Sequence, residues 1–77
     1  MHHAWLPRFL ASEADRLVSS ADYYRALFPE LPEEHPARVL SATLAKRREE
    51  AARELRKFIE LGTEKSLMDG YSFLLNL

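Results

Sequence analysis

The chain has 77 residues, of which 47% are hydrophobic and 30% are charged, and its net charge at neutral pH is −1. This composition is typical of a folded globular domain rather than a disordered chain. The balanced charge gives no general attraction to nucleic acid or anionic lipid. One domain spanning residues 1–77 buries only about 60% of the surface that its unfolded chain exposes. Its core is therefore marginal unless a disulfide, a metal or a second subunit adds to it.

The chain contains no cysteine, which excludes disulfides, thiolate metal sites and a cysteine nucleophile. No apolar run approaches the ~20 residues that a bilayer-crossing helix needs. The N-terminus also lacks the basic region and cleavage site of a signal peptide. We therefore expect a cytoplasmic protein without membrane contact, in which a second copy supplies the missing core.

The first half of the chain carries apolar residues in steps of three and four, which predicts a helix over residues 6–28. These residues are Leu6, Leu10, Ala14, Leu17, Val18, Ala21, Tyr24 and Phe28. Ser19 and Ser20 followed by Asp22 repeat a capping pattern, so the sequence leaves open a break near Ser19. We expect residues 1–5 to be frayed. Whether Met1-His2-His3 is native or a cloning remnant is left open.

Three prolines place a linker over residues 29–36, because proline fixes φ and lacks a backbone donor. Residues 37–61 contain no Gly, Pro, Asn, Asp or Cys and predict one long helix, with Pro36 in its first turn. His35, just before it, is expected either to cap this helix or to be exposed to solvent. Arg48 interrupts the inward apolar stripe of this helix. The stripe consists of Ala37, Leu40, Leu44, Ala51, Leu55, Phe58 and Ile59.

The end of the chain has two possible structures. Gly62 is a good C-terminal stop and Thr63 can cap a short helix from Glu64 to about Leu75. Residues 71–77 also alternate as a strand would, although nothing else in the chain reads as a strand to pair with it. We favour the helix.

These elements together predict an all-α fold. Two long helices joined by the Pro-rich linker form a hairpin, and the short C-terminal helix folds back on it. Two helices cannot shield both apolar stripes, so we expect a homodimer with a four-helix-bundle-like centre.

The charged block over residues 46–57 contains six bases and three acids. Its interleaved glutamates repel phosphates, and no aromatic side chain within it can stack on a base. We interpret the block as a solvated helix face with local pairs such as Glu49–Arg53 and Glu54–Lys57. Nucleic acid is therefore not the expected partner. A nucleic-acid-associated regulator that uses this basic face remains the alternative.

No residues form a recognisable catalytic or metal-binding set. His35 has no histidine or carboxylate at a metal-ligand spacing, and the serines have no histidine at a triad-like spacing. We therefore predict no enzyme activity, no cofactor and no metal. A small subunit of a cofactor-free enzyme is a third alternative.

The chain has more aromatic and apolar residues than a three-helix monomer of this size can cover, and such surplus surface usually marks a contact site. Tyr23 and Tyr24 point about 100° apart, while Phe73 and Leu77 lie off the stripe of their segment. Arg48 needs a carboxylate or a carbonyl if it is buried, and Glu13 and Asp15 are candidates. The candidate interface residues are Trp5, Tyr23, Tyr24, Phe28, Arg48, Tyr71, Phe73 and Leu77. The sequence thus predicts a small non-enzymatic protein that acts through protein–protein contacts as an adaptor, chaperone-like or regulatory subunit.

Overall fold

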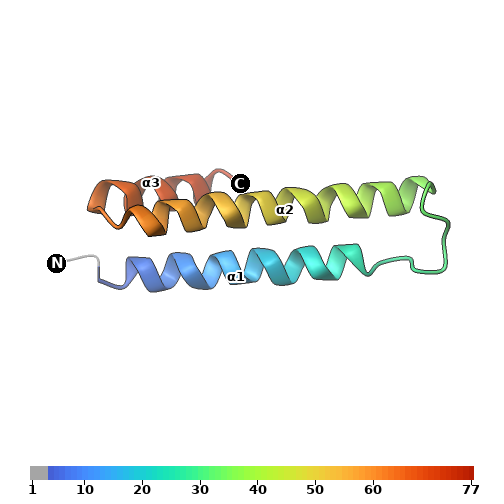
Figure 1. Ribbon diagram of the computed structural model, residues 1–77, viewed down its shortest axis with the longest axis horizontal. Helices are drawn as coiled ribbons and strands as arrows, with labels where there is room; N and C mark the ends of the chain where they lie inside the picture. Colours follow the sequence, from blue (N-terminus) through green and yellow to red (C-terminus); the bar gives the residue numbers. More distant parts are fainter. Residues whose placement is uncertain (1–3) are drawn as a thin grey trace.

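The computed structural model describes residues 4–77 and is all-helical over that range. Its helices are α1 (Leu6–Arg25), α2 (Pro36–Leu61) and α3 (Glu64–Leu75). Figure 1 shows α1 and α2 as an antiparallel hairpin, with α3 turning back beside α2 near the start of α1. The molecule is elongated, with extents of 51 × 17 × 15 Å. The predicted all-α hairpin with a short third helix is confirmed.

The first helix runs without a break through Ser19 and Ser20, so the alternative of a break near Ser19 is wrong. Ala21 is buried and Val18 packs against the core on either side of that point. Packing against α2 therefore outweighs the capping tendency of the serines. The helix ends at Arg25, three residues before the expected Phe28. Phe28 instead has a left-handed φ of 58°, which costs a residue with a Cβ about 1–2 kcal/mol.

The linker covers residues 26–35, so it begins earlier than the predicted 29–36. Pro36 is the first residue of α2, and the Nδ1 atom of His35 accepts a hydrogen bond of 3.1 Å from the Ala37 N–H. Of the two alternatives for His35, N-capping is therefore the one observed. The Arg38 guanidinium donates to the Leu31 carbonyl at 2.7 Å and holds the linker against the start of α2.

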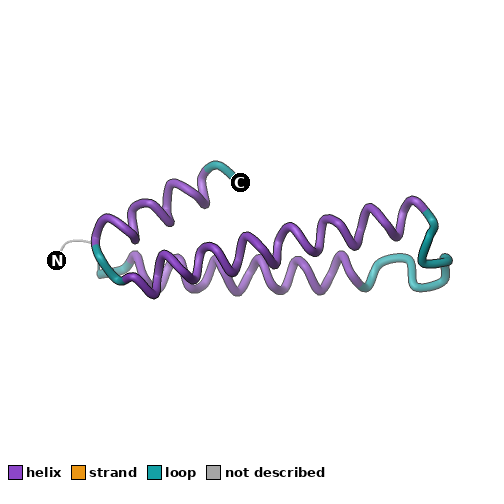
Figure 2. The backbone as a smooth tube through the Cα atoms, turned by 45° about the horizontal axis from the view of Figure 1, so that its top comes forward, coloured by secondary structure: helices purple, strands orange, loops and turns teal. Residues whose placement is uncertain are grey.

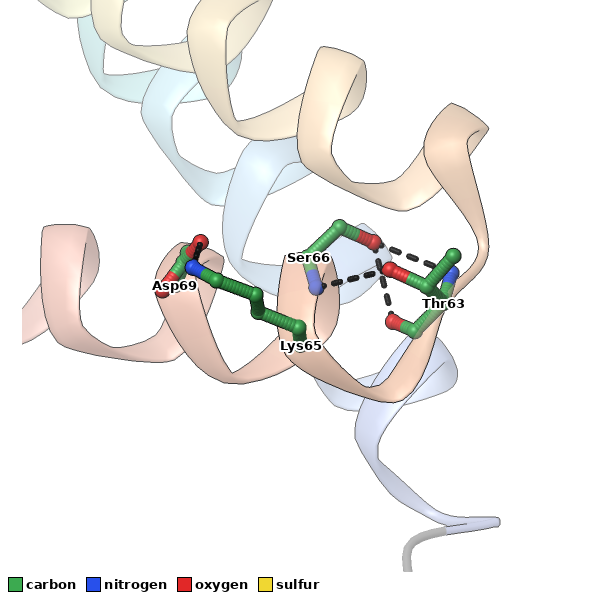
Figure 3. Close-up of polar contacts among 4 residues, drawn as sticks. All are labelled: Thr63, Lys65, Ser66 and Asp69. Atoms are coloured by element: carbon green, nitrogen blue, oxygen red, sulfur yellow. Dashed lines mark hydrogen bonds and ion pairs between the residues drawn. The ribbon is translucent and has the colours of Figure 1, made fainter.

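The turn between α2 and α3 is fixed by two local devices. Gly62 has a φ of 69°, the left-handed conformation that glycine adopts without a Cβ penalty. Thr63 and Ser66 then form a reciprocal capping box, in which each side-chain oxygen accepts the other residue's backbone N–H at 3.0 Å (Figure 3). Lys65 and Asp69 pair at 2.9 Å along the same helix. The helical alternative for the end of the chain is confirmed.

The core lies where all three helices meet, at the end of the hairpin that α3 covers. Its buried residues are Leu6, Leu10, Ala14, Ala52, Leu55 and Leu67. Phe73 packs against this core, and its ring centroid is 5.8 Å from that of Phe58. The placement of Phe73 off the apolar stripe was therefore wrong, because α3 turns one flank toward α2.

The predicted inward stripe of α2 is only partly correct. Leu40 was expected inside but is 59% exposed, and Leu44 is half-buried. The buried positions of this part of α2 are Ser41 and Ala45, each one residue further along. Small side chains therefore face α1. Leu40 and Leu44 lie instead on the side of α2 that α3 covers nearer to the C-terminal end of α2.

Replacing Leu55 should test the position of the core. Leu55 is fully buried, so Leu55→Ala should lower the free energy of unfolding by about 2–5 kcal/mol. The matched control is Leu61→Ala on the same helix, where the side chain is 68% exposed and the loss should stay within about 0.5 kcal/mol. Urea titration followed by circular dichroism measures both. Equal losses for the two variants would contradict the core described above.

Gly70 should resist replacement although it lies inside a helix. A Cβ at this position would lie 3.0 Å from the Phe58 Cβ and 3.3 Å from the Leu10 Cδ1. Gly70→Ala gains about 1 kcal/mol of helix propensity, but overpacking typically costs about 1–3 kcal/mol, so we expect a net loss. Ser72→Ala, at an exposed position of α3, should be neutral or slightly stabilising. A Gly70→Ala protein more stable than wild type in thermal melts would show that α3 does not approach so closely.

Candidate protein-contact surface

One half of the hairpin has no third helix on it. α3 has 12 residues against 26 in α2, and it ends about halfway along α2, as Figures 1 and 2 show. At the end of α3 a groove of about 300 Å³ opens between the helices. We call this the end groove. It is lined by Leu17, Leu44, Arg47, Arg48, Ala51 and Leu77.

The apolar surface continues from the end groove toward the linker. Leu40 lies one helical turn before Leu44, and residues four apart are neighbours on a helix surface. On α1, the half-buried Tyr24 contacts the exposed ring of Tyr23 edge-on, with centroids 5.4 Å apart. We call residues 17–25 of α1 with residues 36–48 of α2 the open half of the hairpin.

Arg48 lies in the open half and is held by an aromatic ring. Its guanidinium carbon is 4.5 Å from the centroid of the Tyr24 ring, and it donates a long hydrogen bond of 3.4 Å to the Leu44 carbonyl. Of the two kinds of partner expected for a buried Arg48, the structure shows a backbone carbonyl and no carboxylate among the described residues. Glu13 pairs with Arg16 at 3.7 Å within its own helix.

The register of the hairpin explains why Arg48 does not reach Asp15. Tyr24 lies opposite Arg48, whereas Asp15 lies opposite Arg56 and accepts a 2.7 Å hydrogen bond from it. Arg56 is eight residues beyond Arg48, or about 12 Å at the rise of an α-helix. The carboxylate is thus out of reach, and the tyrosine ring is the group that faces the guanidinium.

On the face of the hairpin away from α3, an ion pair joins the two long helices. Arg25 donates two hydrogen bonds to the Glu49 carboxylate, at 2.7 and 2.9 Å. These hydrogen bonds lower the pKa of Glu49 and raise that of Arg25. Glu49 lies about 200° around α2 from Ala51, which lines the end groove. The hairpin therefore has one face on which a bidentate ion pair joins the two helices, and one apolar face that is open over half its length.

The bases of residues 46–57 do not form a single positive face. Arg48 stacks on Tyr24, Arg56 pairs with Asp15, and Lys57 makes the predicted pair with Glu54 at 4.0 Å. Glu49 binds Arg25 rather than the predicted Arg53, because the carboxylate lies within reach of the neighbouring helix.

A second apolar surface lies at the other end of the molecule, between α1 and α3. Trp5, Phe9 and Tyr71 form a triangle of rings with centroids 5.8, 6.0 and 6.2 Å apart. We call this the aromatic seam. Trp5 is 52% exposed but packed, so the expected fraying does not extend to it. Met1, His2 and His3 lie outside the described residues, so the expected fraying of these three residues and their origin stay untested.

The structure divides the predicted interface residues among four places. Tyr24, Arg48 and Leu77 lie in or beside the end groove, with Tyr23 on the ring of Tyr24. The remaining residues lie elsewhere: Trp5 and Tyr71 are in the aromatic seam, Phe28 is in the linker and Phe73 is at the core. Leu17 and Leu44, which are half-buried and line the end groove, and the exposed Leu40 were not predicted at this surface because all three fit an inward stripe. Sequence reasoning also missed Phe9, although the spacing of four from Trp5 was a usable signal.

Within residues 4–77 no three metal-ligating side chains come together. None of the three helices is long and apolar enough to cross a bilayer. What the open half offers is a strip of leucines bordered by a tyrosine and two arginines, residue types that are common at protein interfaces.

A double-mutant cycle should detect the stacking of Arg48 on Tyr24. The coupling free energy between Arg48→Met and Tyr24→Leu should be about 0.5–1 kcal/mol, the usual size of an exposed cation–π contact. Arg48→Met alone should remain folded, because methionine keeps the apolar stem. The control cycle pairs Arg47→Met with Tyr24→Leu and should show no coupling. Urea unfolding of the six proteins gives both values; equal coupling in the two cycles would rule out the stack.

The Arg25–Glu49 pair should make stability depend on pH. A lowered pKa in the folded state means that the ionised carboxylate stabilises the fold above its unfolded pKa. This contribution is lost as the pH falls through the folded value, below 4.5. The stability difference between wild type and Glu49→Gln should therefore be present at neutral pH and vanish in acid. Thermal melts across this range measure it, and a difference that persists at the acid end would refute the assignment.

Comparison with models of known protein families, with curated proteins and with solved structures finds no match for this chain. The contact surface therefore rests on the geometry alone.

Proposed function

We propose that this protein is a small, non-enzymatic, cytoplasmic helical protein that acts through protein–protein contacts as an adaptor, chaperone-like or regulatory subunit. The open half of the hairpin is its contact surface. The observation that supports this proposal is that α3 stops partway along α2 and leaves the end groove and Leu40 uncovered. Contiguous exposed apolar surface on a small protein usually marks a site of interaction.

The groove suits a helix as its occupant. The two helices that hold α3 also form the walls of the open half, so a helix placed there would continue the path of α3. Leu40 and Leu44 would supply the apolar anchors, as in other helix-in-groove contacts. Tyr24 and Arg48 are residue types that dominate binding energy at the centre of interfaces. Their mutual stacking orients both side chains before binding and lowers the entropy lost on contact.

The contact we propose is self-association into a homodimer with a four-helix centre. Two open halves placed face to face bring two copies of α1 and α2 together. The leucines of each copy would then be covered by those of the other. Such a dimer adds core to a chain that has no cysteine and only 77 residues.

Sedimentation equilibrium at tens of micromolar should show a dimer of the 8.9 kDa chain. Leu40→Ser should shift the equilibrium toward monomer without unfolding the chain, because this side chain is already 59% exposed. Leu61→Ser is the matched control: it lies on the same helix, is 68% exposed and lies outside the open half. A wild-type protein that stays monomeric, or equal effects of the two variants, would argue against this surface.

A further inference from the structure

We infer that the end groove binds a small free carboxylate with an alkyl chain, of about the size of octanoate, whose carboxylate is held by Arg47 and Arg48. This inference goes beyond the proposed function, because every residue that lines the groove belongs to one copy of the chain. It follows from three features of the end groove: its two arginines, its apolar walls and its volume.

Arg47 has hydrogen-bond donors that no other described residue uses. Its side chain lines the end groove and makes no hydrogen bond or ion pair within residues 4–77. Glu50 lies three residues further along the same helix, a spacing that allows pairing, but it forms no ion pair with Arg47. A guanidinium has five N–H donors and no acceptor, so an unpaired one beside an apolar wall favours an anion.

Arg48 lines the same groove and is already oriented. Its guanidinium carbon lies 4.5 Å from the centroid of the Tyr24 ring, and its hydrogen bond to the Leu44 carbonyl is long, at 3.4 Å. The ring attracts the positive charge of the guanidinium and is not a hydrogen-bond acceptor in its plane, so N–H donors stay available for a carboxylate. The stack therefore holds this side chain in place before a ligand arrives.

The negative end of α3 does not cancel these two charges. α3 ends at Leu75, and Leu77, two residues later, lines the end groove. The two guanidiniums carry two positive charges against about half a negative charge at a helix C-terminus, so the groove keeps an excess of about one and a half positive charges. An anionic head group therefore complements it.

The other walls of the end groove are apolar and suit an alkyl chain. They are formed by the half-buried Leu17 and Leu44 together with Ala51 and Leu77. The volume of about 300 Å³ is at the small end of the range for ligand clefts. It equals the space of about ten water molecules in the liquid, and a carboxylate of about eight carbons has about as many non-hydrogen atoms. A phospholipid with two chains is too large, so the ligand is a free, single-chain acid.

Titration of the nitrogen-labelled protein with octanoate, followed by NMR, tests the inference. A ligand of about ten atoms in an open groove should bind with a dissociation constant in the millimolar range. A neutral diol and a trimethylammonium salt of the same chain length should bind about tenfold more weakly or worse, because neither offers a charged acceptor. Butyrate should also bind more weakly, since each buried methylene raises the affinity by up to about fourfold.

A pair of neighbouring variants isolates the role of the guanidinium. Arg47→Met keeps the apolar stem but loses the donors, so the dissociation constant for octanoate should rise about tenfold while circular dichroism stays unchanged. Lys46→Met is the matched control. It removes the same charge from the adjacent residue, which lines a different hollow of α2 with Val39 and Thr43, and should change the constant by less than about twofold. Equal effects of the two variants would reduce the binding to general charge attraction and overturn the inference.

The remaining outcomes separate this inference from the proposed function. Sedimentation equilibrium without ligand reports on the dimer independently. A wild-type protein that dimerises but does not respond to octanoate overturns the ligand site and leaves the contact surface standing, whereas a monomer that binds octanoate does the reverse. Equal affinity for the acid, the diol and the ammonium salt would show an unspecific apolar patch. Binding to anionic phospholipid vesicles that Arg47→Met abolishes would assign the groove to a membrane surface, and either result overturns the inference.

Discussion

The close approach of α1 and α2 is made by small side chains, and the rest of the structure depends on it. Ala14 and Ala21 on one helix, and Ala45 and Ala52 on the other, are almost completely buried. Alanine costs little side-chain entropy and lets two backbones come near, but it contributes little apolar area. The larger apolar residues therefore lie toward the edge of the contact, where only a further element can cover them. α3 covers one part of that edge, and the open half is the remainder.

The half of the molecule that α3 covers provides most of the buried core, and the other half carries the proposed binding surface. The three large side chains that are fully buried, Leu6, Leu10 and Leu55, lie under or beside α3. The half next to the linker is held by alanines, one bidentate ion pair and the stack of Arg48 on Tyr24. Local opening is easiest where few apolar contacts hold the chain. The half proposed to bind is thus also the half that can adjust its shape to a partner.

The helices could be predicted from the sequence because their ends are determined locally. Pro36, Gly62 and Thr63 act through their own backbone and nearest neighbours, and each does what its residue type predicts. Which residues of α2 are buried could not be predicted from the sequence. The apolar side of α2 packs against the long helix α1 and, over only part of its length, against the shorter helix α3. The partner of Arg48 depends on the register between helices, which local sequence does not specify. The sequence therefore indicated that some apolar residues would remain uncovered, but it did not indicate that they would lie in the open half.

The aromatic seam has a spectroscopic consequence. Trp5 is the only tryptophan of the chain, and its ring lies against Phe9 of α1 and Tyr71 of α3. Indole emission depends on the polarity of its surroundings, so the native fluorescence of this protein reports on whether α3 is docked. Circular dichroism, in contrast, is dominated by the 46 residues of α1 and α2 together, 20 in one and 26 in the other. The two signals distinguish the departure of α3 from the melting of the hairpin without any added label.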